Sequence, residues 1–325
     1  MKIYRVEQSD GDFIETTVPD PIAKAGEVIV RVRASGVSPL DTKIRAGQAA
    51  HAKQPLPTVL GLDMAGVVVE VGEAVTAFKQ GDEVYGMTGG VGGLQGSLAE
   101  FVVADADLLA LKPASLSMRE AAALPLNTIT AWEGLVDRAA VRAGQKVLIH
   151  AGAGGVGHIA VQIAHAFGAQ VFATVSADKT EFATRFGATA IDYKALSLEQ
   201  YLVKYTDGAG FDVVYDTVGG KTLDDSFASV RRYTGHVLSC LGWGSHLLAP
   251  LSFRGATYSG VFTLLPLITG EGRAHHGNIL AAAAKLADEG KLKPLLAGKH
   301  FDGSTIGQAH ALVISGSLGK VVVEF

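Results

Sequence analysis

The 325-residue sequence predicts an α/β protein with two parts, a β-rich barrel-like unit and a doubly wound parallel sheet. Short β-branched runs separated by glycine turns fill the first third of the chain, as in barrels of short strands. Strand-like and helix-like segments then alternate from residue 146 to residue 262, as in a doubly wound sheet. The length favours two domains of roughly 150 residues each. A content of 48% hydrophobic and 18% charged residues indicates well-buried cores.

The first third of the chain has strand patterns at residues 27–33, 65–71, 83–85 and 100–103, each bounded by turn residues. The loops of such a unit are its candidates for chemistry. One loop, residues 36–47, brings together the hydroxyl of Ser38, the carboxylate of Asp41 and the cation of Arg45. It equally fits a solvated turn in which Pro39 opens a short helix and Ser38 or Asp41 caps it. Composition alone does not decide between these readings.

A helical connector separates the two parts. Ser117 and Glu120 have the spacing of a capping box, and Pro125 is expected to end this helix before a second one at residues 127–137. We therefore place the domain boundary here. The expected units are residues 1–122 together with 264–325, and residues 123–263.

A glycine-rich turn at residues 151–157 organises the second part. It follows an apolar run at residues 146–149 and precedes apolar residues at helical spacing up to Phe167, with Gly168 ending the helix. Gly152, Gly154 and Gly157 stand in G-x-G-x-x-G register, which lets the backbone approach a pyrophosphate. The free N–H groups and the dipole of the helix favour an anion there. The pattern predicts a dinucleotide site, the alternative being a purely structural turn.

The segments after this turn continue the alternation. Strands are expected at residues 171–175, 190–192, 211–215, 235–241 and 257–262, with helices at 180–186 and 197–205. With the run at 146–149 this gives six strands. In such sheets the ligand lies at the carboxyl ends of the strands, where both the glycine turn and Val218 fall.

The end of the second strand indicates which dinucleotide binds. An NAD site normally has an acidic residue there, about 20 residues past the first glycine, to accept from the ribose 2′-hydroxyl. This chain has Ser176, and Asp178 has the spacing of a helix cap that would occupy its carboxylate. Ser176, Lys179 and Tyr193 could instead serve a 2′-phosphate. The sequence therefore predicts NADPH.

The last part of the chain should contain helices at residues 277–289 and 304–314 and strands at 295–301 and 320–325. We expect the terminal strand to pair with the first unit, which makes that unit discontinuous.

Charge and cysteine content narrow the function. The net charge is −4 and no run is rich in Lys or Arg, so neither nucleic acid nor an anionic membrane is an expected partner, and small-molecule chemistry fits better. Cys240 is the only cysteine, which excludes an internal disulfide and suggests a reducing compartment. The N-terminus is charged where a signal peptide is apolar, and no run of about 18 apolar residues occurs. We expect a cytoplasmic protein.

Over essentially its full length the chain resembles the zinc-independent medium-chain dehydrogenases/reductases, most closely the NADPH:quinone oxidoreductase (zeta-crystallin-like) branch. The motifs that carry this resemblance are residues 36–42 with Arg45 and Gly47, 61–66, 71–72, 81–84, 124–126 with 130–131, 151–157 and 216–220.

The resemblance implies a GroES-like β-barrel formed by both ends of the chain, a Rossmann domain between them, and a homodimer formed through the last Rossmann strand, residues 256–262. Its substrate side would hold Ser38, Asp41 and Arg45. Its cofactor side is expected to comprise Thr130, Gly152, Gly154, Gly155, Val156, Gly157, Ser176, Lys179, Tyr193, Val218, Leu241, Gly242 and Lys320.

The positions that hold catalytic zinc in related alcohol dehydrogenases carry other residues here. Ser38 replaces the first cysteine ligand, and Leu62 and Asp63 replace the His-Glu pair of that branch. The N/S ligand set that zinc requires is therefore missing, and no metal is expected.

Without a Lewis acid, reduction of a quinone or another electron-poor conjugated carbonyl by NADPH is easier than alcohol oxidation. No side chain stands out as a general acid. Two alternatives stay open. One is a reductase of the C=C bond of enals, enones or enoyl thioesters, and the other is an NADPH-binding structural protein with little turnover.

Overall fold

The computed structural model describes residues 1–325 and divides the chain into two compact units. Unit 1 comprises Met1–Ile129 and Leu264–Phe325, and unit 2 comprises Thr130–Thr263. The chain thus passes from unit 1 to unit 2 between Ile129 and Thr130, later than the boundary expected at residues 122–123. Asp63 of unit 1 accepts a hydrogen bond from the backbone N–H of Leu126 at 2.8 Å, so the start of the connecting helix belongs to unit 1.

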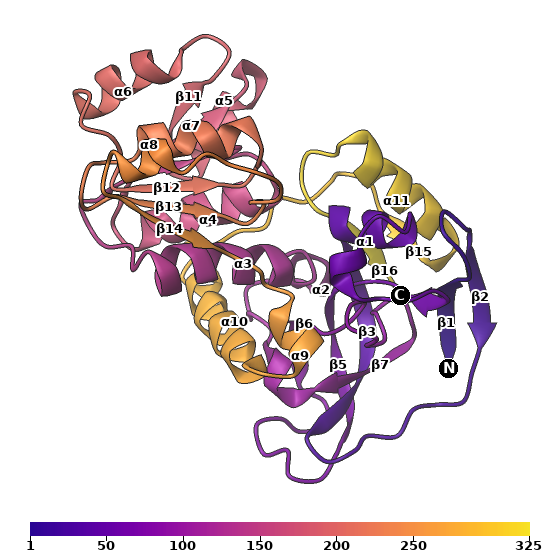
Figure 1. Ribbon diagram of the computed structural model, residues 1–325. Coiled ribbons are helices and arrows are strands. Elements are labelled where there is room, and N and C mark those ends of the chain that lie inside the picture. The colour runs from indigo at the N-terminus through magenta and orange to yellow at the C-terminus, as the bar shows by residue number, and fades with distance from the viewer. The chain divides into compact units, whose positions relative to one another are not determined.

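Unit 1 contains two sheets (Figure 1). The small sheet has the order β2 (Phe13–Thr17), β1 (Lys2–Val6) and β4 (Thr58–Val59). The large sheet has the order β15 (Phe301–Asp302), β16 (Val321–Glu324), β3 (Glu27–Val37), β5 (Asp63–Val71), β6 (Glu83–Met87) and β8 (Leu109–Leu111), with β7 (Phe101–Asp105) also paired to β3. The helices are α1 (Pro39–Arg45), α2 (Met118–Ala121), α9 (Leu265–Thr269), α10 (Arg273–Asp288) and α11 (Ile306–Ser315), with 3-10 turns at Ala50–Ala52, Ala106–Leu108 and Gly303–Thr305.

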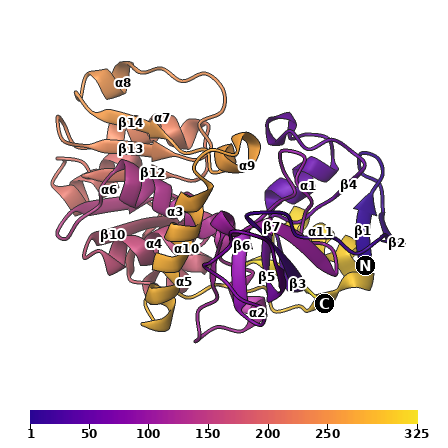
Figure 2. The same ribbon diagram turned by 90° about the horizontal axis from the view of Figure 1, so that it is seen from below.

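The long strand β3 is the centre of the large sheet. Its valines Val28, Val30 and Val32 alternate with outward-facing residues such as Arg31, and they pack with Met64 into the barrel core. The terminal strand β16 pairs antiparallel with β3, as expected for a unit built from both ends of the chain. The two termini accordingly lie near each other (Figure 2), and the Tyr4 and Phe325 rings are 5.7 Å apart.

Unit 2 is a parallel sheet of six strands, as predicted. Its order is β11 (Ala188–Asp192), β10 (Gln170–Val175), β9 (Lys146–Ile149), β12 (Val213–Asp216), β13 (His236–Ser239) and β14 (Thr257–Gly260). Its helices are α4 (Gly155–Ala166), α5 (Thr180–Arg185), α6 (Leu198–Thr206), α7 (Lys221–Ser229) and α8 (Ala249–Ser252), with a 3-10 turn at Ala177–Lys179. The order reverses direction between β9 and β12, so the carboxyl ends of these strands form the topological switch point.

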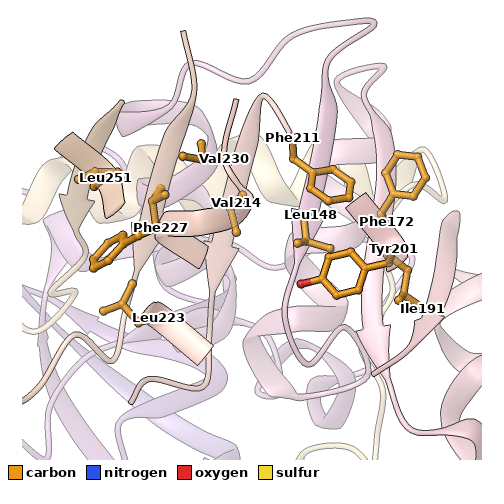
Figure 3. Close-up of a cluster of buried hydrophobic side chains, with 11 residues drawn as sticks. Leu148, Phe172, Ile191, Tyr201, Phe211, Val214, Leu223, Phe227, Val230 and Leu251 are labelled. Atoms are coloured by element: carbon orange, nitrogen blue, oxygen red, sulfur yellow. The ribbon is translucent and has the colours of Figure 1, made fainter. Parts of the chain in front are cut away.

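One face of this sheet is covered by α6, α7 and α8 through an aromatic cluster (Figure 3). Tyr201, Phe211 and Phe227 of the cluster pack on side chains such as Leu148 and Phe172 that alternate along the strands. Because residues two apart along a strand share a face, Thr174 of β10 and His150, the residue after the end of β9, lie on this same face.

Three local expectations differ from the structure. Pro125 begins α3 (Pro125–Trp132) instead of only ending the helix before it, because proline is tolerated in a first helical turn, and a π-helical segment, Glu133–Arg138, follows. The strand expected at residues 295–301 is reduced to β15 and one isolated bridge between Leu296 and Lys320. Asp178 does not cap a helix.

The capping boxes at Ser117 and Ser197 form as predicted. No helix is long and apolar enough to cross a membrane.

Candidate functional site

The glycine turn joins β9 to α4 with no side-chain cap at the helix start, where Gly154 is the N-cap residue. The backbone is packed too closely for side chains. A Cβ atom at Gly152 would collide with Ala173, and one at Gly157 would collide with the carbonyl of Ala151. A Cβ at Gly154 would lie 3.1 Å from that same carbonyl, so the atoms of the turn would crowd a side chain at Gly154 less than one at Gly157. Gly155 and Val156 form the first turn of α4, where N–H groups lack helical acceptors.

A cavity of about 500 Å³ lies beside this turn within unit 2. It brings together five of the residues expected at the cofactor site, namely Gly154, Ser176, Lys179, Tyr193 and Val218. The sequence analysis missed the rest of the lining, chiefly His150, Thr174, Ser197, Tyr201, Thr222 and Asp225. Most of these come from α6 and α7, whose packing distance from the glycine turn no sequence pattern gives.

The end of β10 carries an acid that the sequence analysis had assigned to a helix cap. The α5 helix begins at Thr180 with Lys179 at its N-cap, so Asp178 lies before the helix and is exposed. A hydrogen bond from the Ser176 side chain lowers the pKa of the Asp178 carboxyl, and Lys179 and Lys194 lower it further. The strand end therefore combines one carboxylate with two ammonium groups. Lys194 was not anticipated.

The floor of the cavity is a buried polar pair. His150 Nδ1 lies 3.1 Å from the hydroxyl oxygen of Thr174, which also accepts from the backbone N–H of Ala151. Burial lowers the pKa of His150 to about 4, so this imidazole is neutral at physiological pH. The two-residue spacing of His150 from Leu148, which puts both on one face of the strand, was the sequence signal that could have placed His150 at this site.

Asp216, at the end of β12, fixes the backbone at the expected cofactor residues Val218, Leu241 and Gly242 through hydrogen bonds. The buried Asp216 carboxylate accepts from the backbone N–H groups of Val218 and Gly219 and from the Ser239 hydroxyl. Ser239 in turn accepts from the N–H of Leu241 at 3.1 Å. These bonds hold two neighbouring strand ends together. Leu241 and Gly242 do not line the cavity described above.

Thr130 lies at the first residue of unit 2. Its hydroxyl is 3.0 Å from that of Thr263, the last residue of the unit, and its carbonyl accepts from the buried Tyr215 hydroxyl at 2.7 Å. Thr130 does not line the cavity.

A second cluster lies in unit 1, where β3 meets α1. The Lys320 ammonium donates to the Ser38 hydroxyl oxygen at 2.5 Å and to Asp63 Oδ2 at 2.6 Å. All three residues are buried. Burial raises the pKa of the Asp63 carboxyl, and Lys320 acts against that rise. Of the expected cofactor residues, Lys320 thus lies with Ser38, not with the cavity of unit 2.

Asp41 accepts hydrogen bonds from backbone N–H groups next to this cluster. Its Oδ2 accepts from the backbone N–H of Ser38 at 2.7 Å and its Oδ1 from that of Gly61 at 3.1 Å. The side chain is fully buried, and burial raises its pKa to about 7. The structure gives Asp41 a role in holding two loops together, whereas the sequence analysis had expected it to line a substrate site.

Arg45 is not part of the cluster. It lies at the other end of α1, where its guanidinium donates to the carbonyl of Gly11 at 2.9 Å and lies over the Phe13 ring. The structure therefore does not bring Arg45 together with Ser38 and Asp41, because Arg45 lies at the opposite end of the helix, and its expected place on the substrate side stays a prediction.

No group of three or more His, Cys, Asp or Glu side chains could hold a metal ion. Ser38, at the position of the first cysteine ligand of zinc in alcohol dehydrogenases, and Asp63, at that of the glutamate after the histidine ligand, instead contact the ammonium of Lys320.

Comparison with known proteins agrees with this two-unit architecture. Residues 24–114 match the alcohol dehydrogenase GroES-like domain, and residues 155–266 match the model described as zinc-binding dehydrogenase. The fold and the matched residues define a two-domain NAD(P)H oxidoreductase. The chain belongs to the medium-chain dehydrogenase/reductase superfamily, with relatives in its quinone oxidoreductase and alkenal reductase branch.

Three curated relatives and one solved structure illustrate the similarity. The 2-methylene-furan-3-one reductase of Solanum lycopersicum is 37% identical over 96% of this chain and 75% of its own length. The chloroplastic NADPH-dependent alkenal/one oxidoreductase of Arabidopsis thaliana is 37% identical over 95% and 75%. The quinone oxidoreductase of Homo sapiens is 28% identical over 99% and 97%. The crystal structure of an alcohol dehydrogenase superfamily protein from Novosphingobium aromaticivorans is 52% identical, covers 100% of this chain and 99% of its own, and superposes with a TM-score of 0.98.

Proposed function

We propose that this protein uses NADPH to reduce electron-poor conjugated carbonyl compounds, with the C=C bond of enals and enones as the first acceptor class and quinones as the second. The observation that carries the cofactor part is the cavity of unit 2, where Lys179, Ser176 and Tyr193 lie with the glycine turn. The order of acceptors rests on the relatives, since the two reductases of enone or alkenal substrates are more similar to the chain than the quinone oxidoreductase is.

The glycine turn fits the pyrophosphate of a dinucleotide. Side chains at Gly152 and Gly157 would collide with neighbouring atoms of the turn or the sheet, so these glycines keep the backbone close. The first turn of α4 then offers N–H groups and a positive dipole end to the phosphates. Gly154, Gly155, Val156 and Gly157 would hold this part of NADPH.

The adenosine half would occupy the cavity between the glycine turn, Tyr193 and Val218. Lys179, and with it Lys194, would give the 2′-phosphate an ammonium partner, while Asp178 opposes a second negative charge nearby. Two cations against one carboxylate favour the phosphate over a bare hydroxyl. When bound, NADPH supplies the hydride that the substrate accepts.

On the substrate side, the chain has to stabilise the negative charge that develops on the carbonyl oxygen. Unit 1 offers hydrogen-bond donors at the Ser38 cluster and no metal ligand set. This donor set suits an acceptor whose oxygen becomes an enolate or a hydroquinone anion.

Other acceptors and roles make distinct predictions. An enoyl thioester on a phosphopantetheine arm would require a basic rim to bind its phosphates. An NADPH-binding structural protein would bind the cofactor and turn over none of these acceptors.

The test is a steady-state panel with one enal, one enone, one enoyl thioester and one quinone, each assayed with NADPH and with NADH. We expect kcat/KM to be highest for the enal or enone, and at least tenfold higher with NADPH than with NADH. Equal or better turnover with NADH would refute the cofactor assignment. Cofactor binding without turnover of any acceptor would refute the enzymatic proposal.

A further inference from the structure

We propose that Ser38 is a catalytic residue that donates a hydrogen bond to the carbonyl oxygen of the substrate, and that Lys320 and Asp63 are positioning residues that orient its hydroxyl. This inference rests on the proposed function and assigns a donor to the oxygen that becomes negative. Sequence analysis found no general acid, and it did not connect Lys320 with Ser38.

Counting hydrogens shows that the Ser38 hydroxyl has a proton to give. An ammonium is a donor only, so in the contact between Lys320 and Ser38 the hydroxyl oxygen is the acceptor. No group in the structure accepts from the Ser38 hydroxyl, although Ser38 is only 1% exposed. A buried hydroxyl without an acceptor is destabilising, so we expect a ligand to supply the acceptor.

The charges around Ser38 make it a strong donor. The Lys320 ammonium polarises the hydroxyl through a hydrogen bond to its oxygen, and Asp63 keeps that ammonium in place at 2.6 Å. Asp63 is itself fixed by the backbone N–H of Leu126. The Lys320 side chain packs directly on Gly36 of β3, where an added Cβ would lie 2.8 Å from it. The donor is therefore preorganised before substrate arrives.

The backbone of Ser38 is held in place. Its N–H donates to Asp41 Oδ2 at 2.7 Å, and the residue is the N-cap of α1. Stabilisation of an anion by such a fixed donor acts on the transition state and costs no reorganisation during the reaction.

The reaction balances with this assignment. A hydride with its electron pair forms a C–H bond at the carbon β to the carbonyl, the C=C electrons move to the neighbouring C–C bond, and the C=O electrons move to oxygen. NADPH is oxidised to NADP⁺ and the substrate is reduced. Ser38 donates its hydrogen bond to the enolate oxygen without losing its proton, and the α-carbon takes a proton from water.

The test compares Ser38→Ala, Ser38→Thr and Ser35→Ala with the wild-type protein, using NADPH and an enone. Ser35 is the matched control, since it is a buried serine of β3 three residues before Ser38, and its hydroxyl contacts that of Ser97 at 2.7 Å. We expect kcat for Ser38→Ala to fall about 100-fold, as on loss of one oxyanion donor. Ser38→Thr, which keeps a hydroxyl, should retain most activity, and Ser35→Ala should change kcat less than threefold.

Two further readouts separate chemistry from structure. The dissociation constant for NADPH, from fluorescence titration, and the thermal unfolding midpoint should be unchanged in Ser38→Ala. An unchanged kcat in Ser38→Ala, with an active wild-type enzyme, would overturn the role of Ser38 and leave the proposed function standing. Equal losses in Ser38→Ala and Ser38→Thr would also overturn it. A wild-type protein that reduces no conjugated carbonyl would instead refute the proposed function.

Discussion

The Lys179 side chain lines the cavity of unit 2 beside the glycine turn and contributes the positive charge that we assign to the 2′-phosphate. Replacing it in Lys179→Ala should raise the dissociation constant for NADPH roughly tenfold, a modest effect because the side chain is solvent-exposed. The affinity for NADH should not change. Fluorescence titration with both cofactors measures this.

Lys204→Ala serves as the control for that variant. Lys204 is an exposed lysine of α6 that contacts the Tyr205 ring and does not line the cavity. If Lys179→Ala weakens NADH as much as NADPH, or if Lys204→Ala has the same effect, the 2′-phosphate assignment is wrong.

The buried His310 contributes to the dependence of stability on acid pH. It is fully buried on α11 with both ring nitrogens unpartnered, and its ring lies 4.7 Å from that of Phe13. Burial, with the Arg45 charge, lowers its pKa to about 3. The unfolded chain binds a proton below a pH of about 6.5 while the folded chain does not. The stabilisation is therefore present above that pH and is lost as the pH falls toward 3.

In His310→Leu the free energy of unfolding should fall less steeply between pH 6.5 and pH 4, by up to about 1.4 kcal/mol per pH unit. Urea unfolding at several pH values measures the slope. A slope identical to that of the wild type would show that His310 is not buried in its neutral form.

We propose that the glycine turn binds the cofactor, and we expect alanine substitutions at two of its glycines to have different effects. A Cβ at Gly157 would collide with the Ala151 carbonyl, whereas a Cβ at Gly154 would lie 3.1 Å from it. Gly157→Ala should therefore lower the thermal unfolding midpoint by several degrees, since α4 has to move away from the sheet. Gly154→Ala should leave the midpoint nearly unchanged and weaken NADPH binding by crowding the phosphates. The reverse pattern in unfolding and titration experiments would contradict this account.

Local elements were the part of the fold that sequence predicted well. The glycine turn, the capping boxes at Ser117 and Ser197 and the six strands all depend on spacing within a few residues. The strand expected at residues 295–301 was predicted too long. Only β15 forms at its end, and a single bridge between Leu296 and Lys320 stands where further strand pairing was expected.

Contacts between distant residues were beyond sequence reasoning. Lys320 lies 282 positions from Ser38, and only the pairing of β16 with β3 brings them together. Arg45 is close to Ser38 in sequence but is carried by α1 to a different surface. Asp178 fitted a capping pattern, yet its carboxylate accepts from Ser176. In each case the residue type was visible and its partner was not.

At the scale of the whole molecule, we propose a homodimer through β14, the edge strand of unit 2. One side of β14 pairs with β13, and the N–H groups on its other side are free to pair with a second copy. Gly260→Pro removes one of these outward donors and should convert the dimer to a monomer. Light scattering coupled to size-exclusion chromatography measures the mass, and NADPH affinity reports whether unit 2 stays folded. A wild-type monomer, or a variant that remains dimeric, would contradict the proposal.

The most direct test of the proposed reaction follows a deuterium atom from cofactor to product. The protein is incubated with an enone and with NADPH deuterated at C4 of the nicotinamide, on each face in turn, and the product is analysed by NMR. With one of the two cofactors, the account predicts a saturated ketone that carries a single deuterium on the carbon β to the carbonyl. Deuterium on the carbonyl carbon of an alcohol, or no transfer from either cofactor, would contradict it.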